Sequence, residues 1–113
     1  MVNIIQLSTV ILAGISVGVA DALIKRIAIS DSFWLAIKNP WMIAIFCLYT
    51  IQIVLFIYVF VHKWDLGIVG NTQIAFYSLT VVLSGILFFG ETISLVQALG
   101  ILLTLLGVIL MNL

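Results

Sequence analysis

The stretch Phe88–Ser94, FFGETIS, and the uncharged run that follows it to Leu113 decide the fold of this chain. One apolar segment ends at Phe89, Gly90–Thr92 supply a turn, and a second segment begins at Ile93. At ~1.5 Å per residue, Ile93–Leu113 is long enough to cross the ~30 Å hydrocarbon core of a bilayer. The stretch therefore predicts two membrane-spanning helices joined by a tight turn.

The composition agrees with a membrane setting. Of the 113 residues, 65% are hydrophobic and 7% are charged, and the mean hydropathy is +1.45. A soluble domain of this size needs far more charge on its surface, so we expect an integral membrane protein in contact with the lipid bilayer. The net charge of zero makes nucleic acid an implausible partner.

Four spans can be drawn, at about 4–24, 41–61, 66–89 and 93–113. Their apolar residues do not alternate as transmembrane strands would. The prediction is an all-α membrane protein, a bundle of four transmembrane helices forming a single transmembrane domain over residues 1–113.

The first span carries small residues on two faces and one acid. Gly14 and Gly18 form a GxxxG pair, and Ser16 lies on a second face, so we expect this helix inside the bundle. Asp21 is a functional candidate, because a carboxylate held in lipid costs a few kcal/mol. The alternative, which the spacing favours, is an i,i+4 ion pair with Lys25 at the headgroup level.

The third span is the polar one. Asn71, Gln73 and Tyr77 need partners at membrane depth, either other helices or a substrate. The polar run at 70–73 also permits a local break in the helix, as in transporter sites. The candidate substrate-binding residues are Asn71, Gln73, Tyr77, Ser16 and Asp21.

Small and hydroxyl residues form a stripe on the fourth span, at Gly100, Thr104 and Gly107 with Gln97 before them. Such a stripe lets another helix backbone come close. Packing within the bundle and a dimer interface both remain open for it. Glu91 precedes this span, where the helix dipole favours a carboxylate, and a structural role is expected.

Charge bias suggests an orientation. The 25–40 connection carries Lys25, Arg26 and Lys38, whereas the opposite side carries Lys63. This favours the 25–40 connection in the cytoplasm and both termini outside, although a weak bias is also typical of proteins that insert in both orientations. Trp41 fits an aromatic belt at the interface.

Enzymatic chemistry is not expected. No nucleophile is paired with a base, and the one histidine, His62, lies in a short interfacial connection without ligand partners at metal spacing. We therefore predict no catalytic residues, no metal and no cofactor.

Several of these motifs resemble the small multidrug resistance family. They are four spans in about 110 residues, Lys25 closing the first, Phe88–Glu91 closing the third, and Gly100 and Gly107 in the fourth. Gly90–Gly100 is also similar to the end of a repeat in larger drug/metabolite transporters. The resemblance implies a dimer, often antiparallel, in which helices 1–3 line a chamber and helix 4 supplies dimer contacts, in a bacterial-type inner membrane.

The chain departs from that family at the membrane-embedded glutamate of helix 1, because residues 14–18 contain no acid. This argues against proton-driven export of cationic drugs. Branches without the glutamate include subunits resembling flippases of lipid-linked amino sugars, which work as pairs of different chains. We expect a transporter subunit, in a homodimer or a heterodimer with a related four-helix subunit. It would move a small polar metabolite or a lipid-linked head group by alternating access. The alternative is a non-transporting membrane subunit that scaffolds a partner protein.

Overall fold

The computed structural model describes residues 4–113, and the elements it forms are all helices. They are α1 (Ile4–Ser30), α2 (Phe33–Lys38), α3 (Met42–Val61), α4 (Leu66–Phe89) and α5 (Leu95–Met111). Three of them, α1, α3 and α4, are long and apolar enough to cross a membrane, and they indicate an integral membrane protein. α5 has 17 residues and is about 25 Å long, so it is shorter than the predicted fourth span.

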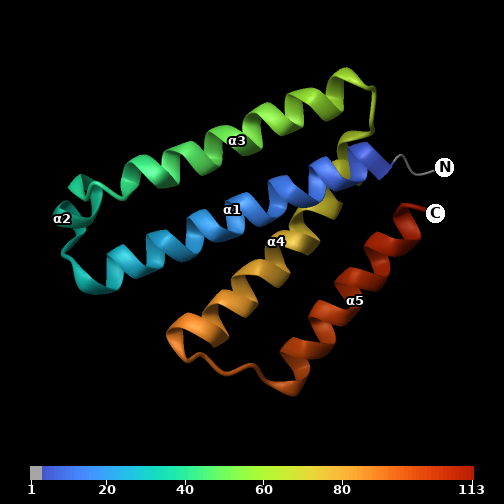
Figure 1. Ribbon diagram of the computed structural model, residues 1–113. Coiled ribbons are helices and arrows are strands. Elements are labelled where there is room, and N and C mark those ends of the chain that lie inside the picture. The colour runs from blue at the N-terminus through green and yellow to red at the C-terminus, as the bar shows by residue number, and fades with distance from the viewer. Residues whose placement is uncertain (1–3) are drawn as a thin grey trace.

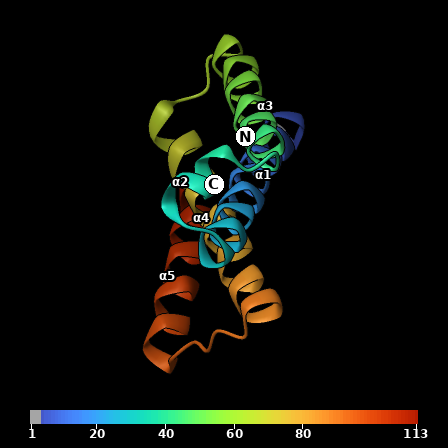
Figure 2. The ribbon, with the colours of Figure 1, turned by 90° about the vertical axis from the view of Figure 1, so that its left-hand side faces the viewer.

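The long helices form a flat arrangement with α1 in the middle. α3 packs on one side of α1 and α4 on the other, while α5 packs chiefly against α4 (Figures 1 and 2). The overall extents are 47 × 36 × 17 Å. The start of α1 and the end of α5 lie at one end, and α2 and the α4–α5 connection lie at the other (Figure 1). The prediction that the first span lies inside the bundle is confirmed.

Two glycines bring α1 and α4 into close contact. A Cβ atom added to Gly14 would lie 2.6 Å from the backbone oxygen of Gln73 and 3.1 Å from the backbone nitrogen of Tyr77. One added to Gly18 would lie 2.6 Å from the Cβ of Thr80. The GxxxG pair therefore serves the α1–α4 crossing, because only glycine leaves room for the other backbone.

The packed core is thin and is centred on α1. At one end Val10 packs with Val59 of α3 and Val69 of α4, and near the other end Ala20 packs with Ile45 of α3. α3 otherwise presents large apolar side chains outward; Phe46, for example, is 65% exposed. Such an apolar surface is stable only against lipid or another protein.

The helices differ from the predicted spans chiefly at the end of α1, in the interior of α4 and at the start of α5. α1 continues past Ile24 to Ser30, because Lys25 and Arg26 are good helix formers and no breaker precedes Ser30. α4 runs without a break through residues 70–73, so the predicted interruption is wrong for this structure.

At α5, the helix starts at Leu95 rather than Ile93. Ser94 is its N-cap in a capping box with Gln97: the Gln97 backbone N–H donates to the Ser94 hydroxyl (3.1 Å), and the Ser94 N–H donates to the Gln97 side chain (2.9 Å).

Candidate functional site

Asp21 is the centre of the candidate site. Its carboxylate accepts one hydrogen bond from the Tyr49 hydroxyl and another from the Tyr77 hydroxyl, one on each oxygen. Asp21 belongs to α1, Tyr49 to α3 and Tyr77 to α4, so this cluster joins all three long helices. The three side chains are each half-buried. We call them the Asp21 cluster.

The position of the cluster follows from the packing of α1. Gly14 and Gly18 let α4 approach closely, and Tyr77 lies at this crossing. Ala20, on the neighbouring face, packs against Ile45 of α3, one turn before Tyr49. Asp21 follows Ala20 directly and is therefore within reach of a phenol from each side.

Energetically, the two phenols make an acid tolerable at this depth. At the centre of a span an ionised Asp costs roughly 2.5–3.5 kcal/mol on the translocon scale, which is an upper bound for Asp21 near the end of the predicted span. Each hydrogen bond to a charged group contributes about 1.5–3 kcal/mol. Two such bonds are therefore enough to offset the cost.

The predicted ion pair between Asp21 and Lys25 is wrong. Lys25 instead pairs with Glu91, just beyond the end of α4, and its ammonium lies 4.9 Å above the centre of the Phe89 ring. Gly85 leaves room for the Glu91 carboxylate, which would have to shift if residue 85 carried a Cβ atom. Glu91 thus ties the α4–α5 connection to α1. The sequence alone does not connect Lys25 with Glu91, since the two residues are far apart in the chain.

A pocket of about 300 Å³ connects the two features. Asp21 lines it together with Ser84, Lys25 and Glu91. The pocket therefore has a carboxylate at one point of its wall and a cation–anion pair at another. These groups bind hydroxyl, amine and carboxylate functions by hydrogen bonds and charge.

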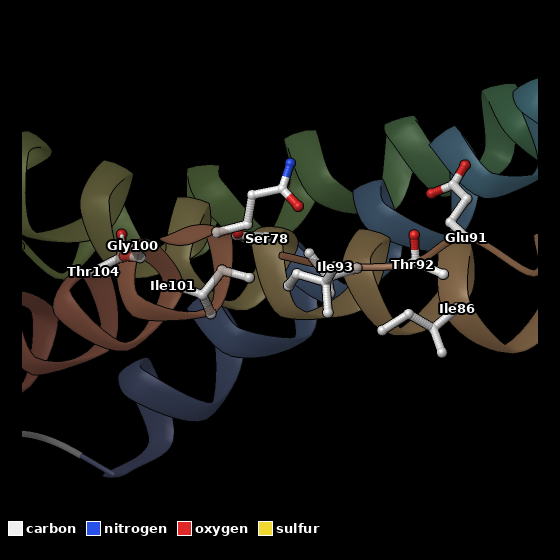
Figure 3. Close-up of a pocket in the computed structure, with 10 residues that line it drawn as sticks. Ser78, Ile86, Glu91, Thr92, Ile93, Gly100, Ile101 and Thr104 are labelled. Carbon is white, nitrogen blue, oxygen red and sulfur yellow. Dashed lines mark hydrogen bonds between the residues drawn. The ribbon is translucent and has the colours of Figure 1, made fainter. Parts of the chain in front are cut away.

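A larger pocket, of about 540 Å³, separates α4 from α5. Glu91 and Thr92 lie at one end of it and Gly100 and Thr104 at the other, with Ser78 between (Figure 3). Because Glu91 lines both pockets, they are neighbours. At the far end of α5, the Asn112 amide donates to the Thr72 hydroxyl (3.1 Å) and holds the helix to α4.

The predicted stripe on α5 faces this larger pocket through Gln97, Gly100 and Thr104. A Cβ atom added to Gly100 or Gly107 would meet no atom within 4 Å among the described residues. The stripe is therefore not used for close packing within this subunit.

The other predicted substrate-binding residues do not join the Asp21 cluster in the described contacts. Asn71 is exposed and donates to the backbone oxygen of Gly67 in its own helix (2.8 Å). Ser16 is buried and donates to the oxygen of Leu12 (2.9 Å). Gln73 is half-buried near Gly14. Among the five candidates, the structure brings Asp21 and Tyr77 together.

Tyr49 was missed by the sequence reasoning, which placed no candidate site residue in the second span. A signal was present: a phenol well inside an apolar span needs a hydrogen-bond partner, and the Asp21 carboxylate has two oxygens that can accept. The sequence alone does not show which acceptor the Tyr49 hydroxyl meets, because this depends on how α3 packs against α1.

Comparisons of the chain with protein families, with characterised proteins and with solved structures give no match. Within residues 4–113, no three His, Cys, Asp or Glu side chains gather as metal ligands would. The Asp21 cluster and the two pockets are therefore the features that bear on function.

Proposed function

We propose that this chain is a subunit of a membrane transporter of the drug/metabolite type, and that Asp21 binds the substrate. The observation that carries the proposal is a carboxylate inside a membrane-spanning helix, held by phenols from two other helices and exposed to a pocket. An intramembrane acid facing a cavity is typical of substrate and ion pathways. The substrate is a small polar metabolite or a lipid-linked head group that bears hydrogen-bond donors.

The contacts of Asp21 suit reversible binding. A substrate amine or hydroxyl can replace either phenol as the donor, and the released tyrosine can hydrogen-bond to the substrate in turn. Because Tyr49 and Tyr77 belong to different helices, such an exchange changes the contacts of α1 with α3 and α4. A ligand that makes different contacts in two states shifts the equilibrium between them, as alternating access requires.

A dimer of four-span subunits is part of the proposal. The flat arrangement, 17 Å thick, leaves the pocket between α4 and α5 open. The stripe of α5 at Gly100, Thr104 and Gly107 leaves room for a second helix, because a Cβ atom at either glycine would meet no atom within 4 Å among the described residues. In this assembly α5 is the fourth span, and the partner is a second copy or a related subunit.

The test is transport by purified protein in lipid vesicles. One set of vesicles is loaded with a mixture of sugars, amino acids and amines, and efflux is followed by mass spectrometry. A second set carries a polyprenyl-phosphate-linked sugar in one leaflet, and its access to an impermeant glycosidase on the other side is measured. We expect the wild type to move its substrate across the membrane in one of the two sets. The Asp21→Asn variant should lose this transport.

The matched control is Thr50→Val, which removes an exposed hydroxyl of α3 that donates to its own helix at Phe46 (2.8 Å). This variant should transport like the wild type. Absence of movement in both sets, with inserted wild-type protein, would refute the proposal. A partner co-purifying in fixed stoichiometry without transport would favour the scaffold function instead.

A further inference from the structure

A basic residue at the end of α1 is placed between an apolar groove and a polar hollow. Arg26 lines a groove of about 560 Å³ between α1 and α4, whose other walls include Val19, Leu23 and Phe88. Arg26 also lines a smaller hollow of about 220 Å³ with Asn39 and Trp41. Arg26 thus lines both the apolar groove and the polar hollow.

The nearby charged side chains are engaged with partners other than Arg26. Lys25, its neighbour, is paired with Glu91. Asp31, the other acid near this end, accepts from the Asn39 amide (3.1 Å). Within the part of the chain that the structure describes, no acid forms an ion pair with Arg26. An exposed cation beside an apolar groove is complementary to an amphiphile with an anionic head.

The depth of the site fits such a ligand. Arg26 comes two residues after Ile24, where the predicted first span ends, and Phe88 and Phe89, the last residues of α4, line the groove. Trp41, in the polar hollow, is a residue type typical of the headgroup level. Basic pockets between membrane helices at this level bind anionic lipid head groups.

We infer that this site holds one anionic phospholipid, with its phosphate on Arg26 and an acyl chain in the α1–α4 groove. The guanidinium binds phosphate through paired N–H donors. The groove volume lies within the ~300–1,000 Å³ typical of ligand pockets. The groove adjoins the pocket beside Asp21, because Ala22, Ser84 and Phe89 line both. None of the three residues of the Asp21 cluster lines the groove, and the inference does not depend on transport.

The experiment is native mass spectrometry of the full chain, released from micelles that contain equal amounts of phosphatidylglycerol and phosphatidylcholine with identical acyl chains. We expect about a fivefold excess of bound phosphatidylglycerol on the wild type, the preference that one basic residue near a membrane surface produces. Arg26→Gln should reduce this ratio to about one.

Two further variants make the test specific. Lys38→Gln removes an exposed cation at the same end of the molecule that lines neither the groove nor the hollow, and it should keep the fivefold ratio. Val19→Trp fills the groove from a partly exposed position while leaving Arg26 intact, and it should lower retention of both lipids.

Three results would overturn the inference. The first is equal retention of the two lipids by the wild type. The second is a variant without its expected effect: Arg26→Gln that still prefers phosphatidylglycerol, or Val19→Trp that retains as much lipid as the wild type. The third is loss of bound phosphatidylglycerol when inorganic phosphate is added at the same concentration as the lipid. This would show that the site recognises free phosphate without an acyl chain.

Discussion

Replacing Gly14 with alanine tests whether the crossing of α1 and α4 is set by the absence of a side chain. The added Cβ would lie 2.6 Å from the backbone oxygen of Gln73 and 3.3 Å from the Cβ of Phe76. A carbon and a carbonyl oxygen normally stay at least ~3.3 Å apart. The two helices must therefore separate locally by about 0.7 Å, since a backbone oxygen cannot rotate away as a flexible side chain does.

The expected cost is obtained by comparison with Gly70→Ala. Gly70 lies in α4, and a Cβ there would meet nothing within 4 Å among the described residues. Both substitutions gain the helix propensity of alanine, about 1 kcal/mol. Overpacking costs typically ~1–3 kcal/mol and applies to Gly14 alone. Gly14→Ala should therefore be less stable than Gly70→Ala by about 1–3 kcal/mol.

The assay is reversible unfolding in mixed micelles, with helix content followed by circular dichroism as the fraction of denaturing detergent rises. Gly70→Ala should unfold at or above the wild-type midpoint, and Gly14→Ala below it. Equal midpoints for the two variants would refute the close crossing and, with it, the route by which Tyr77 reaches Asp21.

The remaining predictions concern polar contacts. Lys25 and Glu91 are 45% and 48% exposed, so a double-mutant cycle with alanine should give a coupling of only about 0.2–1 kcal/mol that weakens as salt is added; a coupling independent of salt would contradict the ion pair. Ser94→Ala removes the N-cap of α5 and should cost about 1 kcal/mol in unfolding experiments, whereas Ser94→Asp should restore most of it. Tyr49→Phe leaves Asp21 with one phenol donor and should destabilise the chain by roughly 1.5–3 kcal/mol, and an unchanged midpoint would show that this hydrogen bond contributes nothing.

Much of the helical architecture could be predicted from local pattern. The third span was expected at 66–89 and α4 occupies Leu66–Phe89, because Asp65 and Gly90 bound an apolar segment of spanning length. Gly90 ends the helix in the left-handed conformation (φ 64°), which glycine adopts without strain. The length of α5 was harder to predict. The uncharged run includes Ile93 and Ser94, whereas the capping box starts the helix after them.

The polar contacts were not predictable in the same way. At i,i+4 spacing, Asp21 and Lys25 are neighbours on α1, and that local geometry favoured an ion pair. The folded chain offers both residues other partners: two phenols for Asp21, and Glu91 for Lys25. A local rule cannot include these competitors, because their approach depends on how α3 and α4 cross α1.

The sequence by itself determined the membrane environment, the helices and the glycine pair that permits close packing, because hydropathy, capping and glycine content act over a few residues of chain. Only the tertiary structure decided that this pair faces α4, that Tyr49 and Tyr77 meet at Asp21, and that the stripe at Gly100 and Thr104 faces an open pocket. The physical reason is that a helix repeats every 3.6 residues whatever surrounds it, whereas contacts between helices depend on the angle and separation at which they pack.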